Sequence, residues 1–146
     1  MTRFAILLLA AALVLPTQAS AHSHKKNGLE IIHPWTRAMV DKSQTTVLVS
    51  MTIKNGGTGD RLLGASTPLA ATAEIREPGK DKALPSVTIG AGKRVEFKRN
   101  GPHLRLTGFK KQLDAYESFA MTLVFEKAGS VVVEVMVEEA EQPNTR

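Results

Sequence analysis

The feature that most limits how this chain can fold is an alternation of apolar residues, repeated in short runs along its length. In one such run every second residue is apolar and of similar size: Val47, Val49, Met51 and Ile53. Between residues 131 and 137 four valines follow the same spacing. A period of two is that of a β-strand with one buried face. No stretch of the chain shows a persuasive helical period, so we expect an all-β protein.

Turn signals separate these runs at regular intervals. The clearest are Asn55-Gly56-Gly57, Ala91-Gly92, Asn100-Gly101 and Ala128-Gly129. They divide the chain into about eight strands spaced roughly ten residues apart, which is typical of an antiparallel sandwich or barrel. We expect one such domain over residues 29–138, with a frayed polar tail over residues 139–146.

The amino end has the parts of a secretory signal. Arg3 supplies a positive charge, residues 4–15 are almost wholly apolar, and Ala19-Ser20-Ala21 is a small-residue cleavage signature. The apolar run is shorter than the about 20 residues that a membrane-spanning helix needs. We therefore expect residues 1–21 to be a cleaved signal peptide, the mature chain to begin at His22, and the protein to be periplasmic and not membrane-spanning.

The composition excludes several kinds of function. The sequence has no cysteine, so it offers no disulfide, thiolate ligand, cysteine nucleophile or thiol for lipid attachment. Its formal net charge is +5, but the basic residues are spread out and no aromatic residues interleave with them. This pattern is typical of a solvated surface and not of a nucleic-acid partner. No hydrolase, phosphate-loop or zinc-protease motif is present, so we expect a binding protein and not an enzyme.

Two of the four histidines lie at the predicted mature amino end. If cleavage follows Ala21, the chain begins His22-Ser23-His24. The free amine, two deprotonated backbone amides and the His24 imidazole then form a square-planar nitrogen set, which is the geometry that Cu(II) favours. The alternative is that residues 22–28 form a flexible, solvated leader without a metal. His33 precedes Pro34 and Trp35, and we expect it to be a structural histidine.

Several segments taken together resemble the PCu(A)C family of periplasmic copper chaperones. They are Ile32-His33-Pro34-Trp35-Thr36-Arg37-Ala38, Gly101-Pro102-His103-Leu104, and residues 51–57, 60–66, 73–77, 89–92 and 123–129. The resemblance implies a cupredoxin-like Greek-key β-sandwich. It also implies a Cu(I) site of two histidines and two methionines, which suit that soft ion, and a copper-receiving periplasmic or membrane-anchored partner.

This chain departs from the family pattern at most of the implied ligand positions. Arg76 occupies the place of the first histidine, and the loop over residues 78–85 has no methionine. The second histidine is kept as His103, but Arg105 replaces the methionine two places later. A guanidinium has no donor lone pair and keeps its positive charge. We therefore expect Arg76 and Arg105 to make the pocket cationic, so that it holds an anion or nothing.

Two functions follow from these observations. The first is a copper-handling protein that holds metal mainly at His22 and His24, with His103 as a weaker candidate. The second is a metal-free interaction module that binds an acidic partner or a small anion through the pocket of Arg76 and Arg105.

Overall fold

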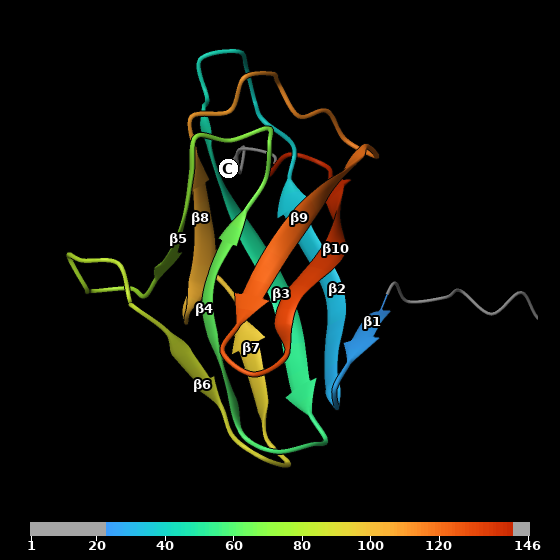
Figure 1. Ribbon diagram of the computed structural model, residues 1–146. Coiled ribbons are helices and arrows are strands. Elements are labelled where there is room, and N and C mark those ends of the chain that lie inside the picture. The colour runs from blue at the N-terminus through green and yellow to red at the C-terminus, as the bar shows by residue number, and fades with distance from the viewer. Residues whose placement is uncertain (1–22, 142–146) are drawn as a thin grey trace, which may run out of the picture.

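The computed structural model describes residues 23–141, which form ten strands (Figure 1). The first five are β1 (Ser23–Lys26), β2 (Leu29–Arg37), β3 (Thr46–Asn55), β4 (Asp60–Ser66) and β5 (Thr72–Arg76). The others are β6 (Val87–Ile89), β7 (Arg94–Phe97), β8 (His103–Thr107), β9 (Ser118–Phe125) and β10 (Gly129–Glu138). Within the described residues no helix could span a membrane. The predicted signal peptide and His22 lie outside this range.

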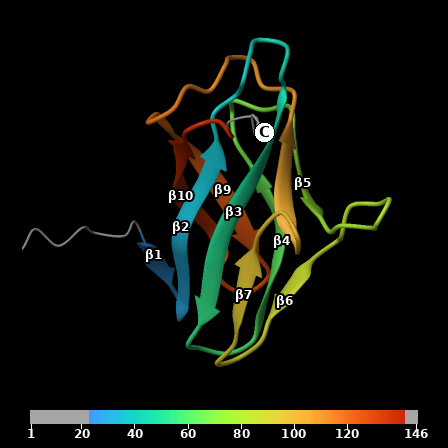
Figure 2. The ribbon, with the colours of Figure 1, turned by 180° about the vertical axis from the view of Figure 1, so that it is seen from behind.

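Strand β3 organises the sandwich because its two halves pair with different strands along one edge. Residues 46–49 pair with β8, and residues 51–54 pair with β7. On its other edge β3 pairs with β2, from which the sheet continues through β10, β9 and β4 to β6. Figure 2 shows β2, β3 and β7 in front of the layer that contains β9, β10 and β4. The pairing of β2 with β10 is parallel, whereas the other strand pairs are antiparallel.

The core lies between the two layers and is built from the alternating residues. The predicted inward face of β3 is buried at Val47, Val49, Met51 and Ile53. The predicted faces of β9 and β10 are buried as well, at Phe119, Met121, Leu123, Phe125, Val131, Val133, Val135 and Val137. Burial of each such side chain stabilises the fold by about 1.5–3 kcal/mol. The sequence pattern therefore predicted both the fold class and the core of these strands correctly.

Strand β1 is the strand that the sequence pattern missed. It pairs antiparallel with β2, and its polar side chains are half-buried or exposed. Lys26 Nζ donates to the Ser130 carbonyl at 2.9 Å, and His24 accepts from the Glu134 amide at 3.2 Å. Over residues 23–26 this pairing is at odds with the flexible leader expected for residues 22–28. Backbone hydrogen bonds hold this segment in place, and a hydrophobic pattern carries no information about them.

A buried carboxylate fixes the turn between β9 and β10. Asp60 Oδ1 accepts from the amides of Arg61 and Lys127 at 2.8 and 2.9 Å, and Oδ2 accepts from the Ala128 amide at 2.9 Å. Burial raises the pKa of Asp60, but the three backbone N–H donors outweigh it and hold the pKa below the usual 3.8. Asp60 therefore joins β4 to the β9–β10 turn as a carboxylate.

Candidate functional site

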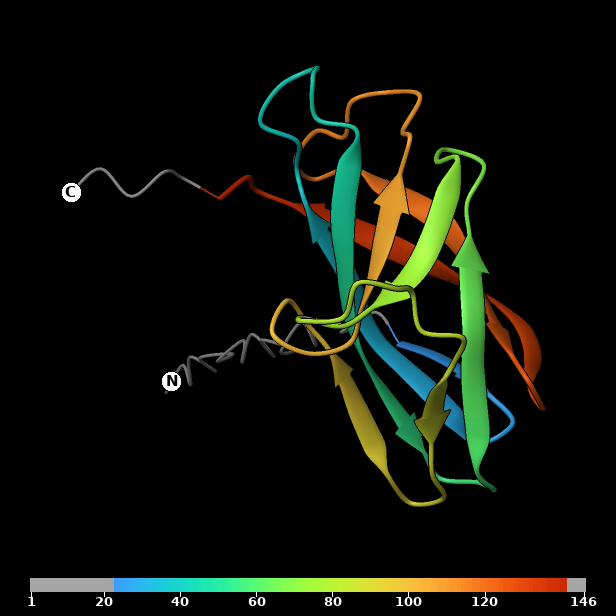
Figure 3. The same ribbon diagram turned by 90° about the vertical axis from the view of Figure 1, so that its left-hand side faces the viewer.

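The outer face of β5 and β8 carries four polar side chains where the sequence predicted an altered copper site. Strand β5 lies beside β8 at the edge seen in Figure 3. The register sets Arg76 directly opposite His103 and Glu74 directly opposite Arg105. Alternate residues of a strand share a face, and all four residues are half-buried on the outer face. The structure therefore brings Arg76, His103 and Arg105 together, as expected.

Glu74 is the member of this group that sequence reasoning missed. Its Oε2 atom accepts from Arg105 Nη2 at 3.1 Å and from Arg76 Nη1 at 3.5 Å. Arg76 Nη2 also donates to the Asp81 carbonyl at 3.0 Å. One carboxylate thus offsets part of the positive charge of the two guanidiniums. The signal was present in the sequence, because Glu74 precedes Arg76 by two residues and must share its face.

The imidazole of His103 is oriented by the turn that precedes β8. Its Nδ1 atom lies 3.0 Å from the Gly101 carbonyl, which can only accept a hydrogen bond. Nδ1 therefore carries the proton and donates, which leaves Nε2 as the lone-pair nitrogen of the neutral ring. A single imidazole nitrogen is the one conventional metal donor among Arg76, His103 and Arg105.

This arrangement does not fit a Cu(I) ion. The two arginines have no lone pair to donate, and the group has no sulfur atom, which is the donor that Cu(I) prefers. Across residues 23–141 no cluster of three or more histidine, aspartate or glutamate side chains could hold a metal ion. Within the described residues, the outer face of β5 and β8 carries the ion pairs of Glu74 with the two arginines, next to the Nε2 lone pair of His103.

The other predicted ligand within the described residues, His24, lies far from this group, because β2 and β3 separate its strand from β8. His24 is in β1, where its Nε2 atom accepts a hydrogen bond from the Glu134 amide of β10 at 3.2 Å. In this contact the proton of a neutral ring is on Nδ1. An amino-terminal Cu(II) chelate would instead use Nδ1 as the metal donor and leave the proton on Nε2. Such a chelate and the observed hydrogen bond exclude each other.

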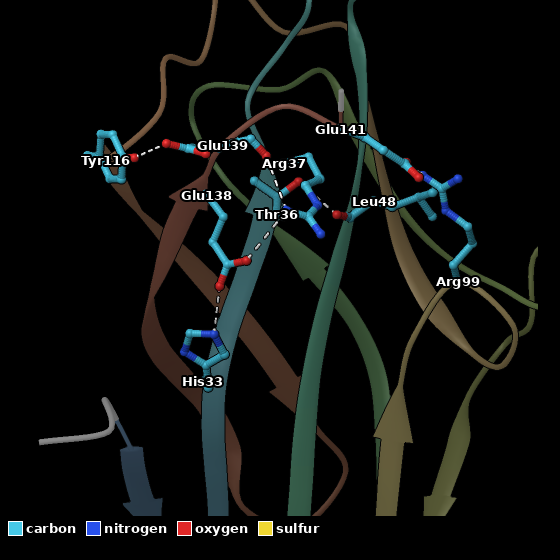
Figure 4. Close-up of polar contacts among 9 residues, drawn as sticks. All are labelled: His33, Thr36, Arg37, Leu48, Arg99, Tyr116, Glu138, Glu139 and Glu141. Atoms are coloured by element: carbon cyan, nitrogen blue, oxygen red, sulfur yellow. Dashed lines mark hydrogen bonds and ion pairs between the residues drawn. The ribbon is translucent and has the colours of Figure 1, made fainter. Parts of the chain in front are cut away.

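A second polar group lies between β2 and the carboxyl end of β10, where His33 contacts Glu138 (Figure 4). His33 is the extra residue of a β-bulge, because Ile32 pairs with Thr52 while Trp35 pairs with Ser50. Its φ of 47° is in the left-handed region, and its Nε2 atom lies 3.0 Å from Glu138 Oε1. His33 is exposed and structural in this arrangement, as the sequence predicted.

On the same face an arginine and a tyrosine are tied to the carboxyl end of β10 (Figure 4). The Arg37 guanidinium carbon lies 5.0 Å from the centre of the Trp35 ring, and Arg37 Nη1 donates to the Glu139 carbonyl at 3.3 Å. The hydroxyl of Tyr116 donates to the Glu139 carboxylate, and this hydrogen bond raises the pKa of Tyr116 above its usual value of 10.0.

Comparisons with known proteins place this chain and its fold in a family. The LpqE-like lipoprotein family matches residues 29–137, which is well over half of the chain. The apo PCuAC domain of PmoF1 is 30% identical with a TM-score of 0.74, over 81% of this chain and 99% of that domain. The chain belongs to the PCuAC family. No curated protein sequence matches it.

Two further PCuAC structures contain copper. The copper-bound PCuAC domain of PmoF2 is 27% identical with a TM-score of 0.73, and the match covers 81% of this chain and 98% of that domain. The Cu(I) form of DR1885 from Deinococcus radiodurans is 25% identical with a TM-score of 0.64, over 84% of this chain and 85% of that protein. The predicted PCu(A)C membership and cupredoxin-like fold are confirmed.

Proposed function

We propose that this PCuAC-family chain is an exported copper-handling protein whose β5–β8 site does not hold Cu(I). The observation that supports this proposal is the register of β5 and β8, in which Arg76 lies directly opposite His103. The family resemblance implies a copper ligand at each of these two positions. Here one of them is a cation without a lone pair, and Arg105 follows two residues after His103.

Copper is held instead as Cu(II) at the mature amino end. The donors are the amine of His22, the deprotonated amides of Ser23 and His24, and Nδ1 of His24, and the two amide protons are released on binding. Four nitrogens in a square plane suit Cu(II). His103 Nε2 is a weaker second candidate because only one donor faces the ion there. The protein acts by binding and not by catalysis, and its partner is a copper-receiving periplasmic or membrane-anchored protein.

Two measurements test the amino-terminal site. Mass spectrometry of the exported protein is expected to find His22 as the first residue. One equivalent of Cu(II) is then expected to give the visible absorption of a square-planar nitrogen complex, which is lost in His24→Ala and kept in the control His103→Ala. A chain that begins at Ser23 or later, or an unchanged spectrum in His24→Ala, would contradict the proposal.

A further inference from the structure

A small cavity lies beside the ion-pair network, between β8 and the end of β2. It encloses about 240 Å³ and is lined by three arginines from separate parts of the chain. Arg37 comes from the end of β2, Arg105 from β8, and Arg99 from the turn between β7 and β8. His103 and the buried Thr36 also line it. Arg76 is held by Glu74 and the Asp81 carbonyl and is not among the lining residues.

We propose that this cavity binds a carboxylate side chain of an acidic peptide segment supplied by a partner protein. The proposal goes beyond copper handling, since none of its groups belongs to the amino-terminal metal site. From the sequence we expected Arg76 and Arg105 to bind an anion together. In this proposal Arg37 and Arg99 act with Arg105, and Arg76 takes no part.

Arg105 presents a donor that the described residues leave unused. Its Nη2 atom is paired with Glu74, but its Nε atom is buried and has no hydrogen-bond partner within residues 23–141. A buried N–H without an acceptor loses its hydration without compensation. Arg105 lines the cavity, and a rotation of its guanidinium would turn the buried Nε–H towards a carboxylate oxygen there. Hydrogen bonds between guanidinium and carboxylate are among the stronger ones in proteins.

The other two arginines already contact carboxylates of the chain's own carboxyl-terminal segment (Figure 4). Arg99 Nη2 lies 3.4 Å from Glu141 Oε2, and Arg37 Nη1 lies 3.9 Å from Glu138 Oε2. Both side chains of the Arg99–Glu141 pair are more than two-thirds exposed, so the pair is weak and easily displaced. Glu141 thus forms with Arg99 the kind of ion pair that we propose for a carboxylate of the partner.

The surface next to the cavity explains why the ligand is a peptide and not a free ion. Arg37 and Arg99 also line a neighbouring groove of about 480 Å³, whose half-buried apolar residues include Ile32, Trp35 and Leu48. A free ion would leave this apolar surface uncovered. A segment in which acidic and apolar residues alternate matches both the charge of the cavity and the surface of the groove.

Trp35 is the only tryptophan of the chain, so its fluorescence reports on this groove directly. The protein would be titrated in metal-free, low-salt buffer with a short peptide of alternating glutamate and leucine, and with the matched glutamine–leucine peptide. We expect a saturable fluorescence change with the glutamate peptide only. Arg105→Gln and Arg99→Gln should each weaken binding about tenfold, and Glu141→Gln should tighten it severalfold because a competing carboxylate is removed.

Arg61→Gln is the matched control. It removes the same charge from β4, where Arg61 pairs with Glu126 at 2.6 Å and lines neither the cavity nor the groove. If Arg61→Gln weakened peptide binding equally, the binding would depend only on the overall positive charge of the protein, and the proposal would be overturned. Binding of inorganic phosphate as tightly as the peptide would overturn the peptide assignment, and so would no binding of the peptide. Arg99 is exposed, so Arg99→Gln decides the matter if Arg105→Gln does not fold.

Discussion

Arg76 and His103 are direct cross-strand neighbours in the β5–β8 pair, and Arg105 lies on the same face two residues beyond His103. If these arginines are what prevents Cu(I) binding, replacing both should create a site. We expect Arg76→His/Arg105→Met to bind Cu(I) more than about a hundredfold more tightly than wild type, because it supplies imidazole and thioether donors and removes two positive charges. Competition with a chromogenic Cu(I) chelator measures this affinity.

Two further variants complete that experiment. Arg105→Met alone should recover less affinity than the double variant, since Arg76 would still face His103. Arg61→His/Arg94→Met introduces the same residue types at exposed positions of β4 and β7 and should bind no more tightly than wild type. A gain of equal size in this control would show that added donors anywhere on the surface are enough.

Docking of β1 and chelation by the amino end should compete. Chelation moves the His24 proton to Nε2, which then cannot accept from the Glu134 amide. Square-planar Ni(II) is diamagnetic and binds the same nitrogen set, so it allows the amides to be followed by NMR. We expect one equivalent of Ni(II) to shift the Glu134 amide resonance and to speed its hydrogen exchange. An unchanged Glu134 amide in a metal-loaded protein would contradict this competition, and His24→Ala should show no response.

Because of Asp60, the free energy of unfolding should fall at low pH. The pKa of Asp60 in the folded protein is held below the usual 3.8, so its contribution is complete above about pH 5 and is lost as the pH falls through 3.8 towards the folded pKa. Asp60→Asn keeps the shape of the side chain but replaces one carboxylate oxygen with an NH2 group. That group cannot accept the hydrogen bond of the backbone N–H that faces it. We expect it to lower the free energy of unfolding by about 1–3 kcal/mol at pH 7.

Urea unfolding at pH 7 and pH 3 tests both parts of this prediction. The difference between wild type and Asp60→Asn should narrow at pH 3, where part of the Asp60 contribution is lost in wild type as well. Asp114→Asn, at an exposed position, should differ little from wild type at either pH. A difference for Asp60→Asn that does not change between the two pH values would show that the carboxylate charge has no role.

The left-handed backbone at His33 should be sensitive to branching at Cβ. His33→Gly and His33→Val both remove the contact with Glu138, but only valine must adopt a φ of 47° with a branched side chain. We expect the valine variant to be less stable than the glycine variant by about 1–2 kcal/mol. Equal thermal stabilities of the two variants would show that the bulge relaxes when the imidazole is lost.

Local pattern predicted the parts of this molecule that depend on a single strand. The period of two identified the buried faces of β3, β9 and β10, and it placed Arg105 beside His103. It could not find β1, whose polar residues 23–26 are held by backbone pairing. It also gave no sign that the β2–β10 pair is parallel, because that depends on the order of strands in the sheet.

The candidate site, too, could be predicted from the sequence only in part. The resemblance to a known family pointed to Arg76, and the register of β5 and β8 then confirmed its position opposite His103. Glu74 could have been found from its spacing to Arg76. The cavity beside Arg105 could not, because Arg37 and Arg99 reach it from other strands and turns, and only the folded topology brings them together.

The proposed function depends most on the absence of Cu(I) from the face of β5 and β8. The direct test is a Cu(I) competition titration of the exported protein carrying His22→Ala and His24→Ala, which removes the amino-terminal donors and leaves the β5–β8 site intact. We expect no Cu(I) to be withdrawn from the chelator. One equivalent of tightly bound Cu(I), lost when His103→Ala is added, would contradict the account.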